Sequence, residues 1–348
     1  MLLKDNFSME NVQRLQDMTG RDPNLLKRVV YAFGLLEAIK LSGLPFIFKG
    51  GTSLMLLMKH PMRLSTDIDI VVKPGTDIDY YIKEAAKIFP FLKCKEQVRV
   101  GKNNIEKRHF KFIYQSPVRD SKFYILLDVV FAENSYSVLA DKEIFNELLL
   151  VEEPKVYVTV PTADCILGDK LTAFAPHTTG VPFGKELEII KQLYDVANLI
   201  DVMDDQNVVA DTYNKTVQEE IAYRGLEADR DDVLQDTIRS AACIIGKGAT
   251  DAEDFAFYMK GIRAINNHVM SCSYSGELAA EQACKVMCLA ACLLKNVEFK
   301  RIEQPENYIK ANIGTTKYKK LGYMKKRKLE AYGYLVEAVQ LLERQEMM

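Results

Sequence analysis

The chain has 348 residues, of which 48% are hydrophobic, and its formal net charge is -2. The length suggests about two domains and a sizeable buried core. A charge close to zero argues against a histone-like coat for nucleic acid, but it permits a local basic patch. No apolar run reaches the roughly 20 residues that span a bilayer. The first residues lack the pattern of a signal peptide, so we expect a cytoplasmic enzyme.

Residues 8–42 predict helical structure at the start of the chain. Asp22 and Pro23 are typical of a helix cap and a first helical position, respectively. Residues 42–45, Ser-Gly-Leu-Pro, then break the helix. The apolar residues 46–48 that follow predict a short buried strand.

A glycine-containing turn follows this strand and precedes an apolar helix. Its residues are Gly50, Gly51, Thr52 and Ser53. Glycines let the backbone approach a ligand closely, and the N–H groups at a helix start favour an anion such as phosphate. The pattern therefore predicts a phosphate cradle.

Two aspartates, Asp67 and Asp69, are spaced to share one face of a second strand. Neighbouring carboxylates repel each other, and a divalent cation such as Mg²⁺ removes that conflict. Two solvated aspartates at a strand end are the simpler interpretation of these residues alone. The preceding glycine turn, together with Arg63 and Ser65, favours a metal and phosphate site.

Further strands are predicted over residues 92–100, 108–114, 123–131 and 155–160, after a helix over 77–89. Asp128 lies inside the apolar strand 123–131, where a lone carboxylate is costly unless it is paired or bound to a metal. It is a candidate third carboxylate. The alternative places Asp128 at a wet edge of the sheet.

The combined pattern, KGGTSL followed by R-x-S-x-D-I-D, resembles the AbiEii/AbiGii toxin family. These are nucleotidyltransferase-like proteins of the DNA polymerase β superfamily, and they include toxins of type IV toxin–antitoxin systems. The resemblance implies an α+β fold: a polymerase β-like nucleotidyltransferase domain with a mixed sheet, followed by a helical C-terminal domain. We place the first domain at residues 1–160 and the second, which would complete the nucleotide cleft, at 161–348.

The resemblance also implies roles for individual residues. Asp67 and Asp69, with Asp128 as a third acid, would bind Mg²⁺ or Mn²⁺. A nucleoside triphosphate would be held by a second set of residues: Gly50, Gly51, Thr52, Ser53, Arg63 and Ser65. Lys170, on a helix that begins near 162, and Asp195, on a helix over 186–202, match the second half of the family pattern. They would face the nucleotide as a cation and a general base, whereas surface charges are the simpler interpretation.

The rest of the chain, residues 205–348, predicts mainly helices. Thr316–Leu329, the basic segment, carries seven Lys and Arg residues interleaved with Tyr318 and Tyr323, which suits either contact with RNA phosphates or a solvated linker. We expect transfer of a nucleotide to RNA, such as a tRNA 3′ end, by a toxin with a cognate antitoxin. The alternatives are modification of a protein hydroxyl or of a small molecule such as an antibiotic, or nucleotide binding without turnover.

Overall fold

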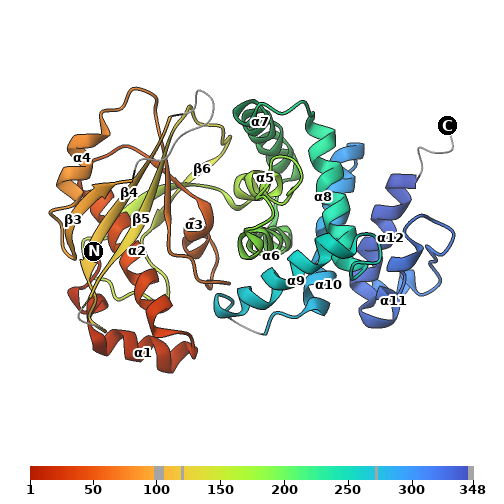
Figure 1. The fold of residues 1–348 in the computed structure, drawn as a ribbon, viewed down its shortest axis with the longest axis horizontal. Coiled ribbons are helices and arrows are strands. Elements are labelled where there is room, and N and C mark those ends of the chain that lie inside the picture. The colour runs from red at the N-terminus through yellow and green to blue at the C-terminus, as the bar shows by residue number, and fades with distance from the viewer. Residues whose placement is uncertain (98–105, 119–120, 271–272, 344–348) are drawn as a thin grey trace. The chain divides into compact units, whose positions relative to one another are not determined.

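The computed structural model describes residues 1–97, 106–118, 121–270 and 273–343. The chain divides into two compact units (Figure 1). The first contains Met1–Thr162 together with Asn267–Cys272, and the second contains Ala163–Asn266 and Ser273–Met348. The division therefore lies two residues beyond the boundary proposed from the sequence. Residues 267–270, which the sequence placed in the helical domain, belong to the first unit.

The first unit is built on a five-stranded mixed sheet, which confirms the predicted α+β class. The strand order is β1-β2-β5-β4-β3. Strands β2 and β5 run parallel, and the other neighbouring pairs are antiparallel. The strand bounds are β1 Ile47–Lys49, β2 Ile68–Val72, β3 Phe91–Glu96, β4 Lys107–Gln115 and β5 Lys122–Phe131. Residues 98–100 of the predicted strand 92–100 lie outside the described residues.

Three helices of the first unit begin after a capping side chain, which is that of Ser8, Asp22 or Asp77. The region predicted as helical over 8–42 forms α1 (Met9–Thr19) and α2 (Pro23–Leu41), separated by Gly20 at a φ of 66°. The Asp22 carboxylate accepts a hydrogen bond from the backbone N–H of Leu25 at 2.9 Å, which confirms the predicted cap. The other helices are η1 (Lys4–Phe7), α3 (Gly50–Leu57) and α4 (Ile78–Ala85), the last shorter than predicted.

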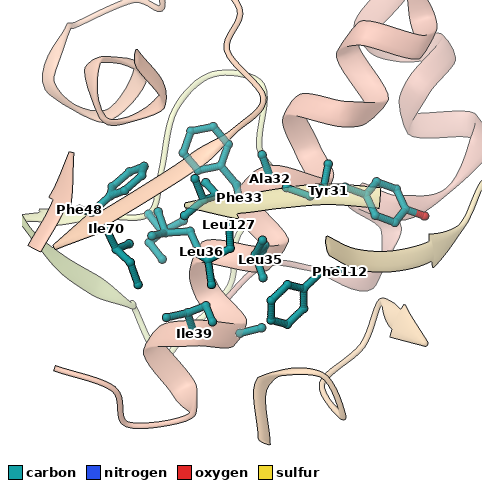
Figure 2. Packing of buried hydrophobic residues seen from close by; sticks show 14 of the residues in the cluster. Tyr31, Ala32, Phe33, Leu35, Leu36, Ile39, Phe48, Ile70, Phe112 and Leu127 are labelled. Atoms are coloured by element: carbon teal, nitrogen blue, oxygen red, sulfur yellow. The ribbon is translucent and has the colours of Figure 1, made fainter. Parts of the chain in front are cut away.

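Helix α2 covers one face of the sheet and forms the core with it. Figure 2 shows its side chains, including Phe33 and Leu36, packed against Phe48, Ile70 and Leu127 from three strands. Along β5 the burial alternates, so every second residue faces this core. The residues between them, among which is Asp128, point to the opposite face.

A separate two-stranded antiparallel sheet joins β6 (Leu139–Glu143) and β7 (Tyr157–Pro161). Strand β7 agrees with the strand predicted over 155–160. Strand β6 was not predicted.

The second unit is helical, as expected. Its helices are α5 Ala163–Ala173, α6 Glu186–Val202, α7 Gln206–Arg224, α8 Arg230–Ile245, α9 Ala252–Ala264, α10 Gly276–Lys295, α11 Met324–Arg327 and α12 Leu329–Glu343, with short 3-10 turns η3 Pro305–Tyr308 and η4 Lys319–Leu321. A further 3-10 turn, η2 Ile265–Asn267, spans the division at residue 266. Among the residues that the structure describes, no helix has both the length and the apolar composition needed to cross a membrane.

Candidate active site

A row of polar residues crosses four strands on the sheet face opposite α2. Lys49 on β1 is the register partner of Asp69 on β2, and Asp69 is the partner of Asp128 on β5. Asp128 is in turn the partner of His109 on β4. Register partners on neighbouring strands project to the same side of a sheet. The fold therefore brings the predicted carboxylates Asp69 and Asp128 side by side.

Asp69 lies directly against the glycine turn. A Cβ added at Gly50 would be 2.3 Å from Oδ2 of Asp69, which no side chain could occupy. Gly50 also has a φ of 82°, in the region that only glycine adopts readily. Glycine at this position therefore lets the Asp69 carboxylate approach the start of α3.

Arg63 and Ser65 lie against the second glycine. A Cβ added at Gly51 would be 2.7 Å from Nη2 of Arg63 and 2.9 Å from Oγ of Ser65. The Arg63 side chain is buried, and its Nη1 donates to the carbonyl of Leu64 at 3.3 Å. A guanidinium is thus held beside the turn, where it would attract an anion.

The hydroxyls of Thr52 and Ser53 are used within the protein. Thr52 Oγ1 donates to the carbonyl of Asp67 at 2.6 Å, and Ser53 Oγ donates to the carbonyl of Gly50 at 2.8 Å. Both side chains are buried. They fix the turn relative to the strand that carries Asp69. An anion at this helix start would therefore be met chiefly by backbone N–H groups.

Asp67 precedes β2 and is more open to solvent than Asp69. Its side chain is 53% exposed, and Oδ1 lies 3.9 Å from Nη2 of Arg28 on α2. An exposed ion pair of this length contributes little to stability. The carboxylate of Asp67 is therefore accessible to a ligand.

Asp128 occupies the central strand of the sheet rather than an edge. Its Oδ1 lies 2.5 Å from Nδ1 of His109, and both side chains are largely buried. The predicted alternative of a wet sheet edge is therefore wrong. His109 fixes one oxygen of Asp128 and leaves the other oxygen for a further partner.

The carboxylates fit a metal that is shared with a nucleotide. Within the described ranges, no group of three or more His, Cys, Asp or Glu residues is arranged to hold a metal ion. Mg²⁺ commonly binds through one or two carboxylates and completes its shell with substrate phosphates and water. Asp69, whose carboxylate lies beside an anion-attracting turn, and the exposed carboxylate of Asp67 two residues earlier are candidates for that kind of site.

Lys170 and Asp195 lie in the second unit and contact each other. Lys170 Nζ is 2.8 Å from Oδ2 of Asp195, and the two side chains are 8% and 2% exposed. Lys170 Nζ also donates to Oε1 of Gln192 at 3.2 Å. The pair links α5 to α6, so the interpretation of these residues as solvated surface charges is wrong.

Sequence reasoning assigned no role to three residues that the structure places around the carboxylates. These are Arg28, Lys49 and His109. His109 comes 19 residues before its partner, and only the register of the β4–β5 pair aligns the two. The available signal was a His in the predicted strand 108–114, which precedes the Asp128 strand along the chain.

A protein-family model covers most of this architecture. The model described as "Nucleotidyl transferase AbiEii toxin, Type IV TA system" matches residues 35–264. This range includes the glycine turn, the polar row and the pair formed by Lys170 and Asp195.

Two solved structures from Helicobacter pylori are similar to the chain at low identity. JHP933 is 12% identical with a TM-score of 0.43, and the alignment covers 78% of this chain and 94% of that one. A protein provisionally described as a nucleotidyltransferase is 12% identical with a TM-score of 0.44, covering 79% of this chain and 99% of that one. No curated protein matches the sequence significantly.

Proposed function

The chain belongs to the AbiEii nucleotidyl transferase toxin family of type IV toxin–antitoxin systems, and from that premise we propose that it transfers a nucleotide from a nucleoside triphosphate to an RNA hydroxyl. The 3′ end of a tRNA is the acceptor that we favour. A family of this kind implies a cognate antitoxin as partner. The proposal places the protein in the cytoplasm, where both substrates occur.

The reaction forms one bond and breaks one. The acceptor oxygen attacks the α-phosphorus, the bond from that phosphorus to the β-phosphate oxygen breaks, and pyrophosphate leaves. The hydroxyl proton passes to a base. Such transfers depend mainly on positioning and on neutralising charge, so the relevant residues are those that fix phosphates and offset their charge.

The observation that carries the proposal is the contact of both glycines with functional side chains. Asp69 lies against Gly50, while Arg63 and Ser65 lie against Gly51. A carboxylate and a guanidinium are thus held around the first turn of a helix, whose N–H groups favour phosphate. A purely structural turn has no need for these opposite charges in the space that a side chain on either glycine would fill.

A divalent cation, Mg²⁺ or Mn²⁺, fits this arrangement when a nucleotide is bound. Asp67 and Asp69 would hold it, with substrate phosphates and water completing its shell. The described residues contain no preformed three-carboxylate site, so the role of Asp128 as a third acid stays a proposal that rests on its place beside Asp69. When bound, the cation would neutralise phosphate charge. His109 would act as a positioning residue, because it orients the Asp128 carboxylate.

The roles suggested for Lys170 and Asp195 stay predictions. Lys170 would offset triphosphate charge, and Asp195 would accept the hydroxyl proton. Their mutual contact at 2.8 Å means that any change to one also leaves the other without its charge partner. Activity measurements on these two residues therefore require a parallel stability measurement.

Incubation with each α-labelled nucleoside triphosphate, Mg²⁺, total RNA and total protein tests the proposal. The wild-type protein should label RNA. Asp69→Asn should reduce labelling by at least about a hundredfold, because it removes a carboxylate that would hold the cation whose charge offsets that of the phosphates. Asp211→Asn, an exposed position on α7, is the matched control and should retain full labelling.

Other outcomes separate the alternatives. If the label appears in protein or in a small molecule, that class of molecule is the acceptor in place of RNA. If the protein binds nucleotide but no fraction becomes labelled, the protein binds nucleotide without transferring it. Full labelling of RNA by Asp69→Asn would remove the assigned role of the polar row.

A further inference from the structure

The basic segment, Thr316–Leu329, has a charge unlike that of the rest of the chain. It contains seven Lys and Arg residues and no Asp or Glu. All 48 acidic residues lie elsewhere, where they outnumber the 39 remaining basic residues. The segment also lies outside the range 35–264 that the family model matches. Its charge is therefore a local feature that the nucleotidyltransferase fold does not account for.

The segment is folded onto the second unit rather than forming a linker. It contains η4 and α11, and the side chains of Leu321 and Met324 are buried. The hydroxyl of Tyr323 donates to the carbonyl of Ile245 at 2.7 Å, and burial raises its pKa to about 12. Tyr323 is thus a structural anchor and is not offered for stacking on a base.

Some of the cations share this anchoring role. Lys320 Nζ donates to the carbonyl of Ala249, and Lys325 Nζ donates to the carbonyl of Ala311, each at 2.9 Å. These contacts fix the backbone that carries the remaining charges. A fixed backbone lowers the ordering cost of binding a charged ligand.

Three cations are left directed to solvent. Lys319, Lys326 and Arg327 are exposed, and none of them forms a salt bridge or a side-chain hydrogen bond within the described residues. They lie close together in sequence on a segment whose apolar side chains face inward. An amphipathic membrane-binding helix would instead present apolar side chains beside its cations. A polyanion with a regular phosphate backbone suits this surface better.

We propose that the exposed cations of the basic segment bind the phosphate backbone of the RNA acceptor. This inference rests on the proposed function for the identity of the ligand, but it concerns binding and not transfer. The contact is made through charge, with no base recognised by this segment. RNA is thereby held by a part of the chain distinct from the glycine turn that is proposed to hold the triphosphate.

Binding of labelled total tRNA across a salt series, without nucleoside triphosphate, tests this proposal. Lys319, Lys326 and Arg327 are replaced together by Gln. Each lost phosphate contact should reduce the slope of log affinity against log salt by about 0.7 to 0.9, so the triple variant should lose about 2 units of slope. At 50 mM salt its affinity should fall by at least about tenfold.

A matched control removes the same charge elsewhere. Lys40, Lys83 and Lys215 are exposed residues of α2, α4 and α7, and replacing all three by Gln should leave the slope near that of wild type. Replacing Lys319 and Lys326 by Arg preserves charge and should preserve binding. Equal slopes in the wild type and the Lys319, Lys326 and Arg327 variant would overturn the proposal, as would equal losses in the variant and the control.

The test also separates this inference from the proposed function. If the triple variant labels RNA with an unchanged Michaelis constant for RNA, the exposed cations do not bind the acceptor, and the proposed nucleotidyl transfer stands. If RNA binding is salt-dependent and requires these cations but no acceptor is labelled, the RNA-binding role of the cations stands and the proposed transfer is rejected. Loss of binding to anionic phospholipid vesicles, with RNA binding intact, would assign the cations to a membrane and overturn the RNA proposal.

Discussion

Gly50 and Gly75 both have positive φ angles, 82° and 79°, but their surroundings differ. A Cβ added at Gly50 would lie 2.3 Å from Asp69 Oδ2, whereas one added at Gly75 would meet no atom within 4 Å. Alanine at either position carries a backbone penalty of about 1–2 kcal/mol. Only at Gly50 must a functional carboxylate also move.

We therefore predict different effects for the two alanine variants. Gly75→Ala should lower the free energy of unfolding by about 1–2 kcal/mol and retain nucleotide transfer. Gly50→Ala should reduce the transfer rate by roughly a hundredfold, because a displacement of about 1 Å in a positioned group has that order of effect. Urea unfolding and transfer rates measure the two quantities. Equal transfer rates in the two variants would show that the approach of Asp69 to the turn is not needed.

At the residue scale, the sequence offered the carboxylates as candidates but did not predict which side chains contact them. Asp69 was singled out by its spacing from Asp67 after the glycine turn, and Asp128 because a charged residue inside an apolar strand requires a partner. The contact of His109 with Asp128 depends on the register of β4 against β5. Register is fixed by which face each strand buries, and the sequence between the two strands contains no turn signal strong enough to align them.

The pair of α5 and α6 shows how two elements share one ion pair. Lys170 and Asp195, one from each helix, are nearly fully buried at 2.8 Å. Removing one member of such a pair leaves an uncompensated charge, at a cost of about 3–5 kcal/mol. Replacing both by apolar residues of similar volume costs far less in comparable proteins.

A double-mutant cycle tests this at the element scale. Lys170→Met and Asp195→Leu should each lower the free energy of unfolding by about 3–5 kcal/mol. The double variant should be more stable than either single variant. Urea unfolding at several pH values gives the difference in the free energy of unfolding between wild type and each of the three variants. Additive losses would mean that the two charges act independently and that the pair does not link the helices.

The elements themselves were predicted unevenly. Helix α6 has the predicted bounds, Glu186–Val202, because its apolar spacing is regular over 17 residues. Strand β6 was missed because its sequence, Leu-Ala-Asp-Lys-Glu, shows neither alternation nor β-branched residues. It is a strand through pairing with β7, and pairing is a tertiary property that propensity does not reveal.

At the scale of the whole molecule, the first unit is made from two distant parts of the chain. The backbone N–H of Leu64 donates to the carbonyl of His268 at 2.8 Å, and that of Met270 donates to the carbonyl of Met62 at 3.0 Å. Between them, Arg63 forms an isolated β-bridge with Val269. The backbone of Arg63 is thus held by residues about 200 positions later. No local pattern predicts such a return, because it depends on contacts far apart in sequence.

This arrangement predicts that a change at Met270 affects the glycine turn through Arg63. Met270→Pro removes the N–H that donates to Met62, and a lost hydrogen bond of this kind contributes about 1 kcal/mol. Hydrogen exchange at the Leu64 amide should then be about fivefold faster than in wild type. The Michaelis constant for the nucleoside triphosphate should rise, because Arg63 is held less firmly beside Gly51.

Met270→Leu keeps the N–H and a similar side-chain volume, so it should match wild type in both measurements. Unchanged exchange at Leu64 in the proline variant would mean that the bridge to residues 267–270 does not restrain Arg63, and that the first turn of α3 is held by its own local contacts.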